Sequence, residues 1–300
     1  MARKKKTPDQ TKLFDLAGVP PEPDPSRLAE PKGRVWSEHK ARLIQRYLRY
    51  FVFVTHHGTY VDGFAGPQDP SQADTWSARL VLESQPQWLR NFFLFELDPT
   101  RLALLERLRA SQPQTPKRQI QVLGGDFNNR VHEILTIGTI KETEATFCLL
   151  DQWTFECEWA TVEALAKHKR LGTKIELFYF LANLWLDRAL KAATTREKKE
   201  QIRRWWGGSD WQSLGNMRRA ERLERWMARL RGLGYKAVSS WPIYESAVSN
   251  RIMYYMIHAT DHPLAPGLMR RAYNSAVRPP EPEEQLALEL GSFGAGEPPN

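Results

Sequence analysis

Four acidic residues, each near the end of a short apolar run, have the type and spacing of a ligand site. They are Asp62, Glu96, Asp126 and Asp151, and they follow one another at intervals of 25 to 34 residues. That interval is about one strand–helix unit, which is typical of a parallel sheet with right-handed crossovers. Ligands of such sheets bind at the carboxyl ends of the strands. Each acid alone is more often a helix cap or a solvated loop residue, but the ordered set favours a ligand site.

The first acid is followed by a turn of small residues that allows a ligand to approach the backbone closely. This turn consists of Gly63, Phe64, Ala65 and Gly66. The chain has neither the G-x-G-x-x-G pattern of dinucleotide sites nor a G-x-x-x-x-G-K-[ST] phosphate loop. An acid with a short turn and no phosphate cradle fits S-adenosylmethionine, which has no pyrophosphate but carries a cationic sulfonium and an amino group. Asp62 is expected to attract that cationic end.

The next two acids have matching roles in this interpretation. Glu96 ends the run "FFLFE" and can accept both ribose hydroxyls. Asp126 of "GGDFN" can accept the adenine amine, with Phe127 along the ring face. The predicted cofactor is therefore S-adenosylmethionine, bound at the ends of the first three strands.

Seven predicted strands would position these acids. Four short apolar runs, 59–64, 91–97, 118–124 and 145–151, read as buried strands, a fifth covers 173–183, and 235–245 with 251–260 form an antiparallel hairpin. Helical patterns lie between them, and the first helix begins near Ser37. We therefore expect an α/β fold: a doubly wound, seven-stranded, mostly parallel sheet.

The chain divides into a central domain with three additions. We expect a central α/β domain over 35–186 and 233–276, a basic helical insertion between the fifth and sixth strands over 187–232, a flexible basic and Pro-rich arm over 1–34 and a flexible acidic tail over 277–300.

The ordered motifs resemble a known family. "YVDGFAGP", "FFLFELDP", "GDFN" and "LLD", together with the W-x3-K pair of Trp36 and Lys40 and the run 254–269, are similar to the three-Cys-motif partner proteins. This resemblance implies a class I S-adenosylmethionine-dependent methyltransferase-like fold. It also makes a three-Cys-motif protein a candidate partner.

The sequence departs from this family at two points. Gln68 follows "FAGP" where the family usually has glycine, and "DQWT" (151–154) stands where a "DPFG"-like stretch is usual. In amino methyltransferases the corresponding region resembles "DPPY", where a carboxylate or amide and a backbone carbonyl hold the target amine while an aromatic ring stacks on the base. By this resemblance Asp151 and Trp153 are the catalytic candidates. The alternatives are that Asp151 caps the helix beginning near "WATVEALAKH" and that the protein is a non-catalytic methyltransferase-like binding partner.

Positive charge is concentrated in one internal segment. The net charge is +8, and residues 187–231 contain thirteen Lys/Arg against six Asp/Glu, whereas the tail has one against five. Such a segment suits an anionic partner, and with interleaved aromatic residues it predicts nucleic-acid binding. Its tryptophans, taken alone, favour inward packing in a helical hairpin; they are Trp205, Trp206, Trp211 and Trp226.

Other features narrow the class of protein. Cys148 and Cys157 cannot form a disulfide framework, and a reducing cytoplasm is the expected location. The longest apolar stretch, 177–186, is too short to cross a bilayer, and no apolar segment follows the basic N-terminus. His56 and His57 are adjacent and no His/Cys cluster has ligand spacing, so no metal site is predicted.

Overall fold

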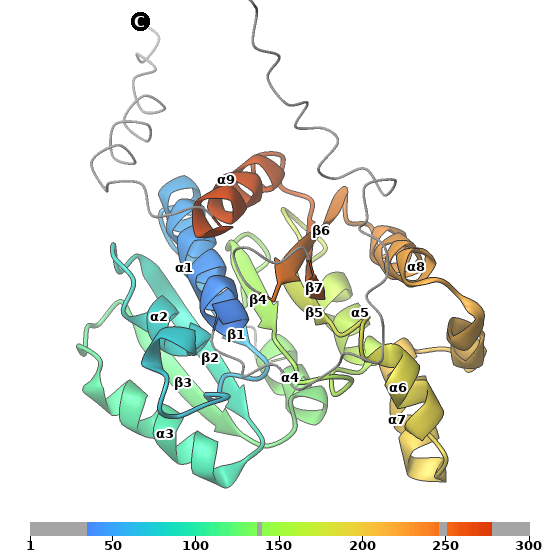
Figure 1. Ribbon diagram of the computed structural model, residues 1–300. Coiled ribbons are helices and arrows are strands. Elements are labelled where there is room, and N and C mark those ends of the chain that lie inside the picture. The colour runs from blue at the N-terminus through green and yellow to red at the C-terminus, as the bar shows by residue number, and fades with distance from the viewer. Residues whose placement is uncertain (1–34, 137–139, 246–250, 278–300) are drawn as a thin grey trace, which may run out of the picture.

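The computed structural model of the chain describes residues 35–136, 140–245 and 251–277 (Figure 1). The predicted arm over 1–34, and all but the first residue of the predicted tail over 277–300, lie outside the described residues. No helix among the described residues combines the length and the apolar character that crossing a membrane requires.

One seven-stranded sheet forms the centre of the fold, in the order β3-β2-β1-β4-β5-β7-β6. Its strands are β1 Gly58–Asp62, β2 Leu89–Glu96, β3 Gln119–Gly124, β4 Thr146–Leu150, β5 Glu176–Leu181, β6 Ala237–Tyr244 and β7 Ile252–Thr260. The first five strands are parallel, and β7 runs antiparallel to both β5 and β6. This strand order, with its antiparallel hairpin at one edge, is the class I methyltransferase-like topology. The predicted fold class is confirmed.

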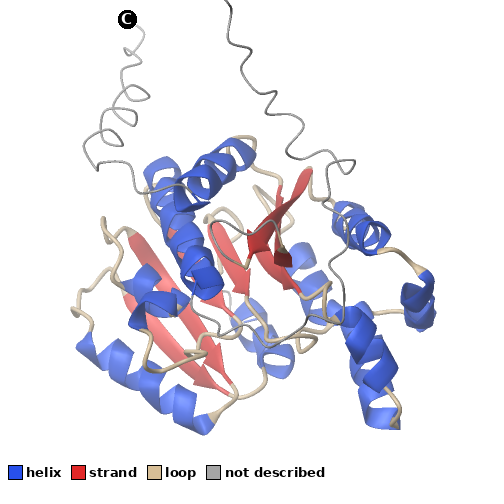
Figure 2. Cartoon of the chain, viewed as in Figure 1, coloured by secondary structure: helices blue, strands red, loops and turns tan. Residues whose placement is uncertain are grey.

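The middle strands are apolar because helices cover both of their faces. Every residue of β1, β4 and β5 is buried, as expected for a parallel sheet between two helical layers (Figure 2). On one side α1 (Val35–Thr55) packs beside α2 (Ser77–Leu82) and α9 (Ala265–Val277). On the other side α4 (Phe127–Thr136) packs against α5 (Trp159–His168). The helix α3 (Pro99–Ser111) connects β2 to β3.

Helices connect β5 to β6, as predicted. They are α6 Leu186–Ala192, α7 Arg196–Trp206, the 3-10 segment η5 Ser209–Asn216 and α8 Arg219–Gly232. Trp205 and Trp226 stack with ring centroids 4.8 Å apart, and the Trp205 indole donates to the Tyr179 hydroxyl of β5 at 2.7 Å. These rings therefore pack inward onto the sheet, as the interpretation of the tryptophans alone predicted.

A half-buried arginine joins the same segment to α5. The guanidinium of Arg229 lies 3.7 Å from the ring centroid of Trp159 and 4.4 Å from that of Trp206. At the end of α7, Gly207 has φ 74°, and a Cβ there would lie 2.4 Å from the Cβ of Trp159. Only glycine fits such a left-handed position in close contact with a neighbouring side chain. The segment is therefore held against α5 and β5 by aromatic packing.

Candidate functional site

A pocket of about 540 Å³ lies at the carboxyl ends of the parallel strands. It is lined by the turn after β1, the ends of β2 and β3, the loop after β4, and one face of α7. Six of the eight predicted cofactor residues line it: Gly63, Phe64, Gly66, Glu96, Asp126 and Phe127. Both predicted catalytic residues, Asp151 and Trp153, line it as well. The sheet therefore brings together most of the residues that the sequence singled out.

The turn after β1 is held against its neighbouring strands by backbone hydrogen bonds. The Gly63 amide donates to the Leu149 carbonyl of β4 at 3.0 Å, and the Ala65 amide donates to the Phe95 carbonyl of β2 at 2.8 Å. The Gly66 amide donates to Glu96 Oε2 at 3.0 Å. A Cβ on Gly66 would lie 2.0 Å from that oxygen, so the absence of a side chain is what lets the carboxylate reach the turn.

Glu96 is oriented by its neighbours, yet keeps accepting capacity. It is 5% exposed, and its Oε1 accepts the Asp98 amide at 2.8 Å. Arg101 lies 3.4 Å from the same oxygen. A carboxylate has about four acceptor sites, so the two backbone donors leave room for further hydroxyl donors from the pocket side. The adjacent Leu97 is 68% exposed and gives the pocket an apolar rim.

Asp62 and Ala65 lie beneath the pocket and do not line it. Asp62 is 1% exposed, accepts the Phe64 amide at 3.1 Å and accepts the Tyr60 hydroxyl at 2.9 Å. Burial is the main cause that raises the pKa of Asp62 to about 7. The two hydrogen bonds act in the opposite direction, and the nearby carboxylates of Asp151 and Glu96 act with burial. Asp62 thus supports the turn from below, and its direct contact with a cofactor stays a prediction.

Asp126 and Phe127 form the part of the pocket after β3. Asp126 Oδ1 accepts both the backbone amide and the side-chain amide of Asn128, at 2.9 and 3.0 Å. Gly125, with φ 121°, makes the turn that leads into this residue. Phe127 is buried, and its ring centroid lies 4.9 Å from that of Phe95. Phe127 therefore lines the pocket while most of its ring is packed into the core.

Asp151 is paired with a buried lysine that the sequence flagged only within the W-x3-K resemblance. Lys40 of α1 places its Nζ 2.6 Å from Asp151 Oδ2, and the two side chains are 3% and 10% exposed. Asp151 Oδ1 is buried and has no hydrogen-bond partner among the described residues. The proposed capping role for Asp151 is wrong, because Glu158 occupies the N-cap position of α5 and the loop 151–158 separates Asp151 from the helix.

The residue after Asp151 anchors this loop. Gln152 is fully buried, donates from Nε2 to the Phe180 carbonyl at 3.1 Å and accepts the Cys157 amide at 2.7 Å. At this position the related motifs have a proline, which restricts the backbone. Here two side-chain hydrogen bonds of Gln152 hold the loop in place. Trp153 follows with 54% of its surface exposed, at the pocket.

The charges around the pocket are unequal. Six carboxylates line it: Glu96, Asp126, Asp151, Glu156, Glu158 and Glu197. Three cations accompany them: Arg101, Lys198 and Arg204. This balance favours a cationic ligand over a phosphate-bearing one. Among the described residues, no group of His, Cys, Asp and Glu side chains has the geometry of a metal site.

The α7 wall of the pocket was not predicted. Glu197, Lys198, Gln201 and Arg204 lie on one face of α7, and Arg204 pairs with Glu158 of the β4–α5 loop at 2.7 Å. A helical pattern indicates that such a face exists, but its contact with a loop some forty residues earlier in the chain depends on tertiary packing.

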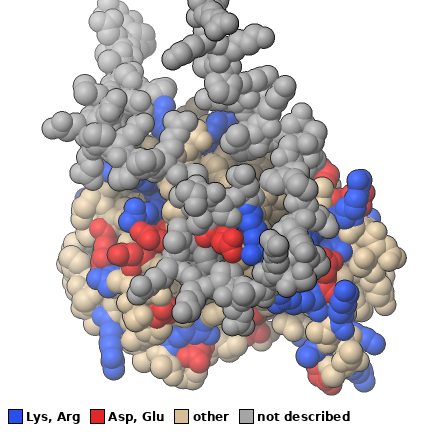
Figure 3. Space-filling model, in the orientation of Figure 1, with Lys and Arg blue, Asp and Glu red and all other residues tan. Residues whose placement is uncertain are grey.

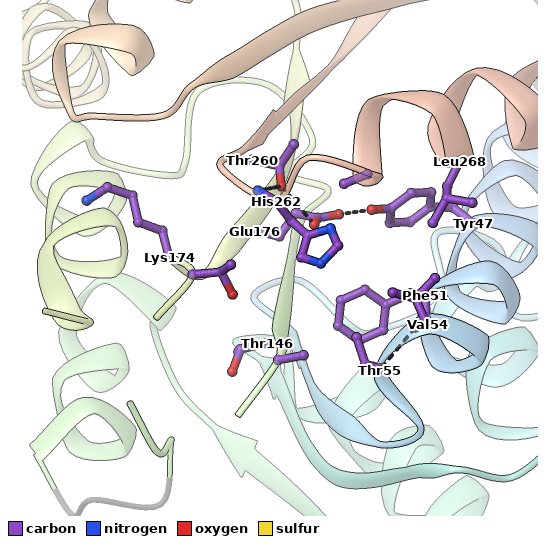
Figure 4. Close-up of a pocket in the computed structure, with 13 residues that line it drawn as sticks. Tyr47, Phe51, Val54, Thr55, Thr146, Lys174, Glu176, Thr260, His262 and Leu268 are labelled. Atoms are coloured by element: carbon purple, nitrogen blue, oxygen red, sulfur yellow. Dashed lines mark hydrogen bonds between the residues drawn. The ribbon is translucent and has the colours of Figure 1, made fainter. Parts of the chain in front are cut away.

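A second cavity, of about 30 Å³, lies at the opposite end of the sheet (Figure 4). Glu176 at the start of β5 accepts the Tyr47 hydroxyl there, and it lies 2.8 Å from His258 Nε2. Thr260 donates to its other oxygen at 3.1 Å. The cavity is the size of a water molecule and is too small for a cofactor. The hydrogen bonds of Glu176 instead join α1 to the sheet.

Comparisons with known proteins give little beyond the fold. The sequence matches no protein-family model and no curated protein. One solved structure with a similar course of the chain is protein LPL1258 from Legionella pneumophila str. Philadelphia 1, described as family-model DUF519. The two share 12% sequence identity with a TM-score of 0.47, over 81% of this chain and 92% of the other. The fold assignment rests on the strand order.

Replacing Lys40 by methionine should strongly destabilise the protein. The substitution leaves the Asp151 carboxylate buried without its cation, which typically costs about 3–5 kcal/mol. Urea unfolding at pH 8 measures the loss. Adding Asp151→Asn to the Lys40→Met variant should recover much of the stability; a double variant as unstable as the single one would contradict the ion pair.

Asp62 should make stability depend on pH in a defined direction. Its pKa is about 7 in the folded protein against 3.8 ordinarily, so the folded state binds more protons between these values. The free energy of unfolding should therefore fall as pH rises from about 4 to about 7, by roughly 2–4 kcal/mol, and then level off. Asp62→Asn should lack this component. Parallel stability curves for the two proteins, from urea unfolding at pH 4.5, 6 and 7.5, would refute the assignment.

Proposed function

We propose that this protein is an S-adenosylmethionine-dependent methyltransferase that acts on an amino group of a nucleic acid. The observation that carries the proposal is the position of Asp151: it lines the same pocket as Glu96, and its buried Oδ1 has no hydrogen-bond partner among the described residues. The pocket can therefore hold a cofactor at Glu96 beside an acceptor for a substrate donor at Asp151.

The pocket fits this cofactor by three features. Its volume of about 540 Å³ lies within the range of small-molecule sites. The missing Cβ of Gly66 brings Glu96 against the turn, where its carboxylate can accept ribose hydroxyls. The excess of carboxylates suits a ligand that carries a sulfonium and an ammonium group. When bound, the cofactor supplies an electrophilic methyl group.

Asp151 and Trp153 support an amino group as the methyl acceptor. Oδ1 of Asp151 can accept a hydrogen bond from a substrate N–H and take the proton that nitrogen loses on methylation. Lys40 Nζ lies 2.6 Å from the other oxygen and holds the carboxylate in this orientation. The exposed Trp153 ring beside it offers a stacking surface for a base. These positions match the roles that the amino-methyltransferase resemblance implies.

The alternative is a methyltransferase-like protein that binds without catalysis. It is favoured by Gln152, whose side chain replaces the proline usual at this position and is fully used in structural hydrogen bonds. The resemblance to the three-Cys-motif partner proteins is compatible with both functions, and it keeps a three-Cys-motif protein as a candidate partner in either case.

The cofactor assignment predicts direct binding of S-adenosylmethionine. Isothermal titration calorimetry should give a measurable Kd, and Glu96→Ala should weaken binding by about 1.5–3 kcal/mol, the range for hydrogen bonds to a charged group. Because Glu96 also accepts two backbone amides, thermal unfolding must first show that the variant is folded. A folded wild type that does not bind at millimolar cofactor would exclude the proposed function.

The catalytic assignment predicts a specific defect in Asp151→Asn. Methyl transfer from radiolabelled cofactor to mixed RNA and DNA oligonucleotides should fall by about 10²–10⁴-fold, because the amide cannot take the proton. Affinity for the cofactor should stay within a few fold. Wild-type transfer rates in the Asn variant would make Asp151 structural, and cofactor binding with no transfer in the wild type would favour the non-catalytic alternative.

A further inference from the structure

The cations of residues 187–231 fall into two sets. Seven arginines form ion pairs with carboxylates: Arg203, Arg204, Arg218, Arg219, Arg222, Arg225 and Arg231. An eighth, Arg229, lies between aromatic rings. Most of the arginines in this segment are therefore already engaged by a carboxylate or an aromatic ring.

The other five cations lie on α6 and at the start of α7. They are Arg188, Lys191, Arg196, Lys198 and Lys199, which we call the α6–α7 patch. All five are exposed, and none forms an ion pair or a side-chain hydrogen bond within residues 35–136, 140–245 and 251–277. In Figure 3, Lys and Arg side chains gather at the lower right, where Figure 1 places α6 and α7.

The patch adjoins the pocket. Lys198 lines the pocket together with Gln201 and Arg204, so α7 presents one face to the pocket and its exposed lysines beside it. The exposed ring of Trp153 lines the same pocket. A chain held along α6 and α7 would therefore pass the opening that leads to Asp151.

Unpaired cations are better suited to phosphates than paired ones. A lysine or arginine without a partner releases its share of counterions from nucleic acid at no loss elsewhere. An arginine in an ion pair must first break a contact and leave a carboxylate beside the incoming phosphate. The location of unpaired charge therefore indicates the binding face better than the total charge of the segment.

We infer that the α6–α7 patch is the docking surface for the phosphate backbone of a nucleic acid, and that the ion-paired arginines of residues 203–231 contribute little to this docking. This inference rests on the proposed function at one point, the expectation that a base of the bound strand reaches Trp153 and Asp151. A nucleic acid is favoured over an acidic protein because a stacking ring lies beside the patch.

A matched pair of triple variants tests the inference. The patch variant is Lys191→Gln, Arg196→Gln and Lys199→Gln, which spares every pocket-lining residue. The control variant is Arg218→Gln, Arg225→Gln and Arg231→Gln, which removes the same charge from the same segment. Binding of a fluorescein-labelled 20-nucleotide single-stranded RNA, and of the DNA of the same sequence, is followed by fluorescence anisotropy from 50 to 300 mM KCl.

The patch variant should lose at least tenfold in affinity at 100 mM KCl. The slope of log K against log[KCl] should become shallower by about 2, since each phosphate contact on a single strand contributes about 0.7. The control should change by less than threefold, even though it exposes three carboxylates. An equal or larger loss in the control would overturn the inference.

Two further measurements separate the possible failures. Calorimetry with S-adenosylmethionine should give the patch variant the same Kd as the wild type. If the wild type binds the cofactor but binds no nucleic acid, the patch assignment is overturned and the cofactor site still holds. Poly-L-glutamate at equal charge should compete weakly for the labelled strand. Equal competition would point to an acidic protein and overturn the nucleic-acid assignment.

Discussion

Buried negative charge at one edge of the sheet is the constraint on which this structure depends. The parallel topology places four carboxylates around the ends of neighbouring strands, where each must be neutralised or hydrogen-bonded. Burial raises the pKa of Asp62 to about 7, Glu96 accepts backbone amides beside Arg101, and Asp151 pairs with a buried lysine. Each of these carboxylates therefore keeps a different ability to bind a ligand. Carboxylates still outnumber cations in the lining of the pocket, which favours a cationic ligand.

The first helix contributes to both ends of the molecule. Lys40 near its start reaches Asp151 at the pocket, and Tyr47, two turns later, donates to Glu176 at the opposite end of the sheet. The His258 ring, which packs edge-on against Tyr47, contacts the same carboxylate. Two buried polar contacts therefore fix the position of α1 relative to the sheet, and the pocket depends on that position because Lys40 has little freedom to move.

The basic segment combines a structural and an exposed role. The packing of Trp205 and Trp226 against β5, with the contacts of Arg204 to Glu158 and of Arg229 to Trp159, attaches it to β5 and α5 and makes α7 a fixed wall of the pocket. The charge that is left over lies on the outside of α6 and α7. A pocket with an excess of carboxylates thus adjoins a face of unpaired cations, and the proposed function would use both.

Local pattern in the sequence was enough to predict the sheet and most of the pocket. Buried parallel strands need continuous apolar runs, and the acids that end them must meet at one edge; hence the strands, the hairpin, and the contribution of Glu96 and Asp126 followed from apolar runs and spacing. The order of the strands came from the structure. Tertiary structure alone decided which charges are engaged. The pairing of Lys40 with Asp151, the placement of Asp62 below the turn, and the division of the basic segment into paired and unpaired cations depend on contacts between residues far apart in the chain. Composition counts charges, but whether a charge is available to a partner depends on what lies within a few ångströms of it, and only the fold sets those distances.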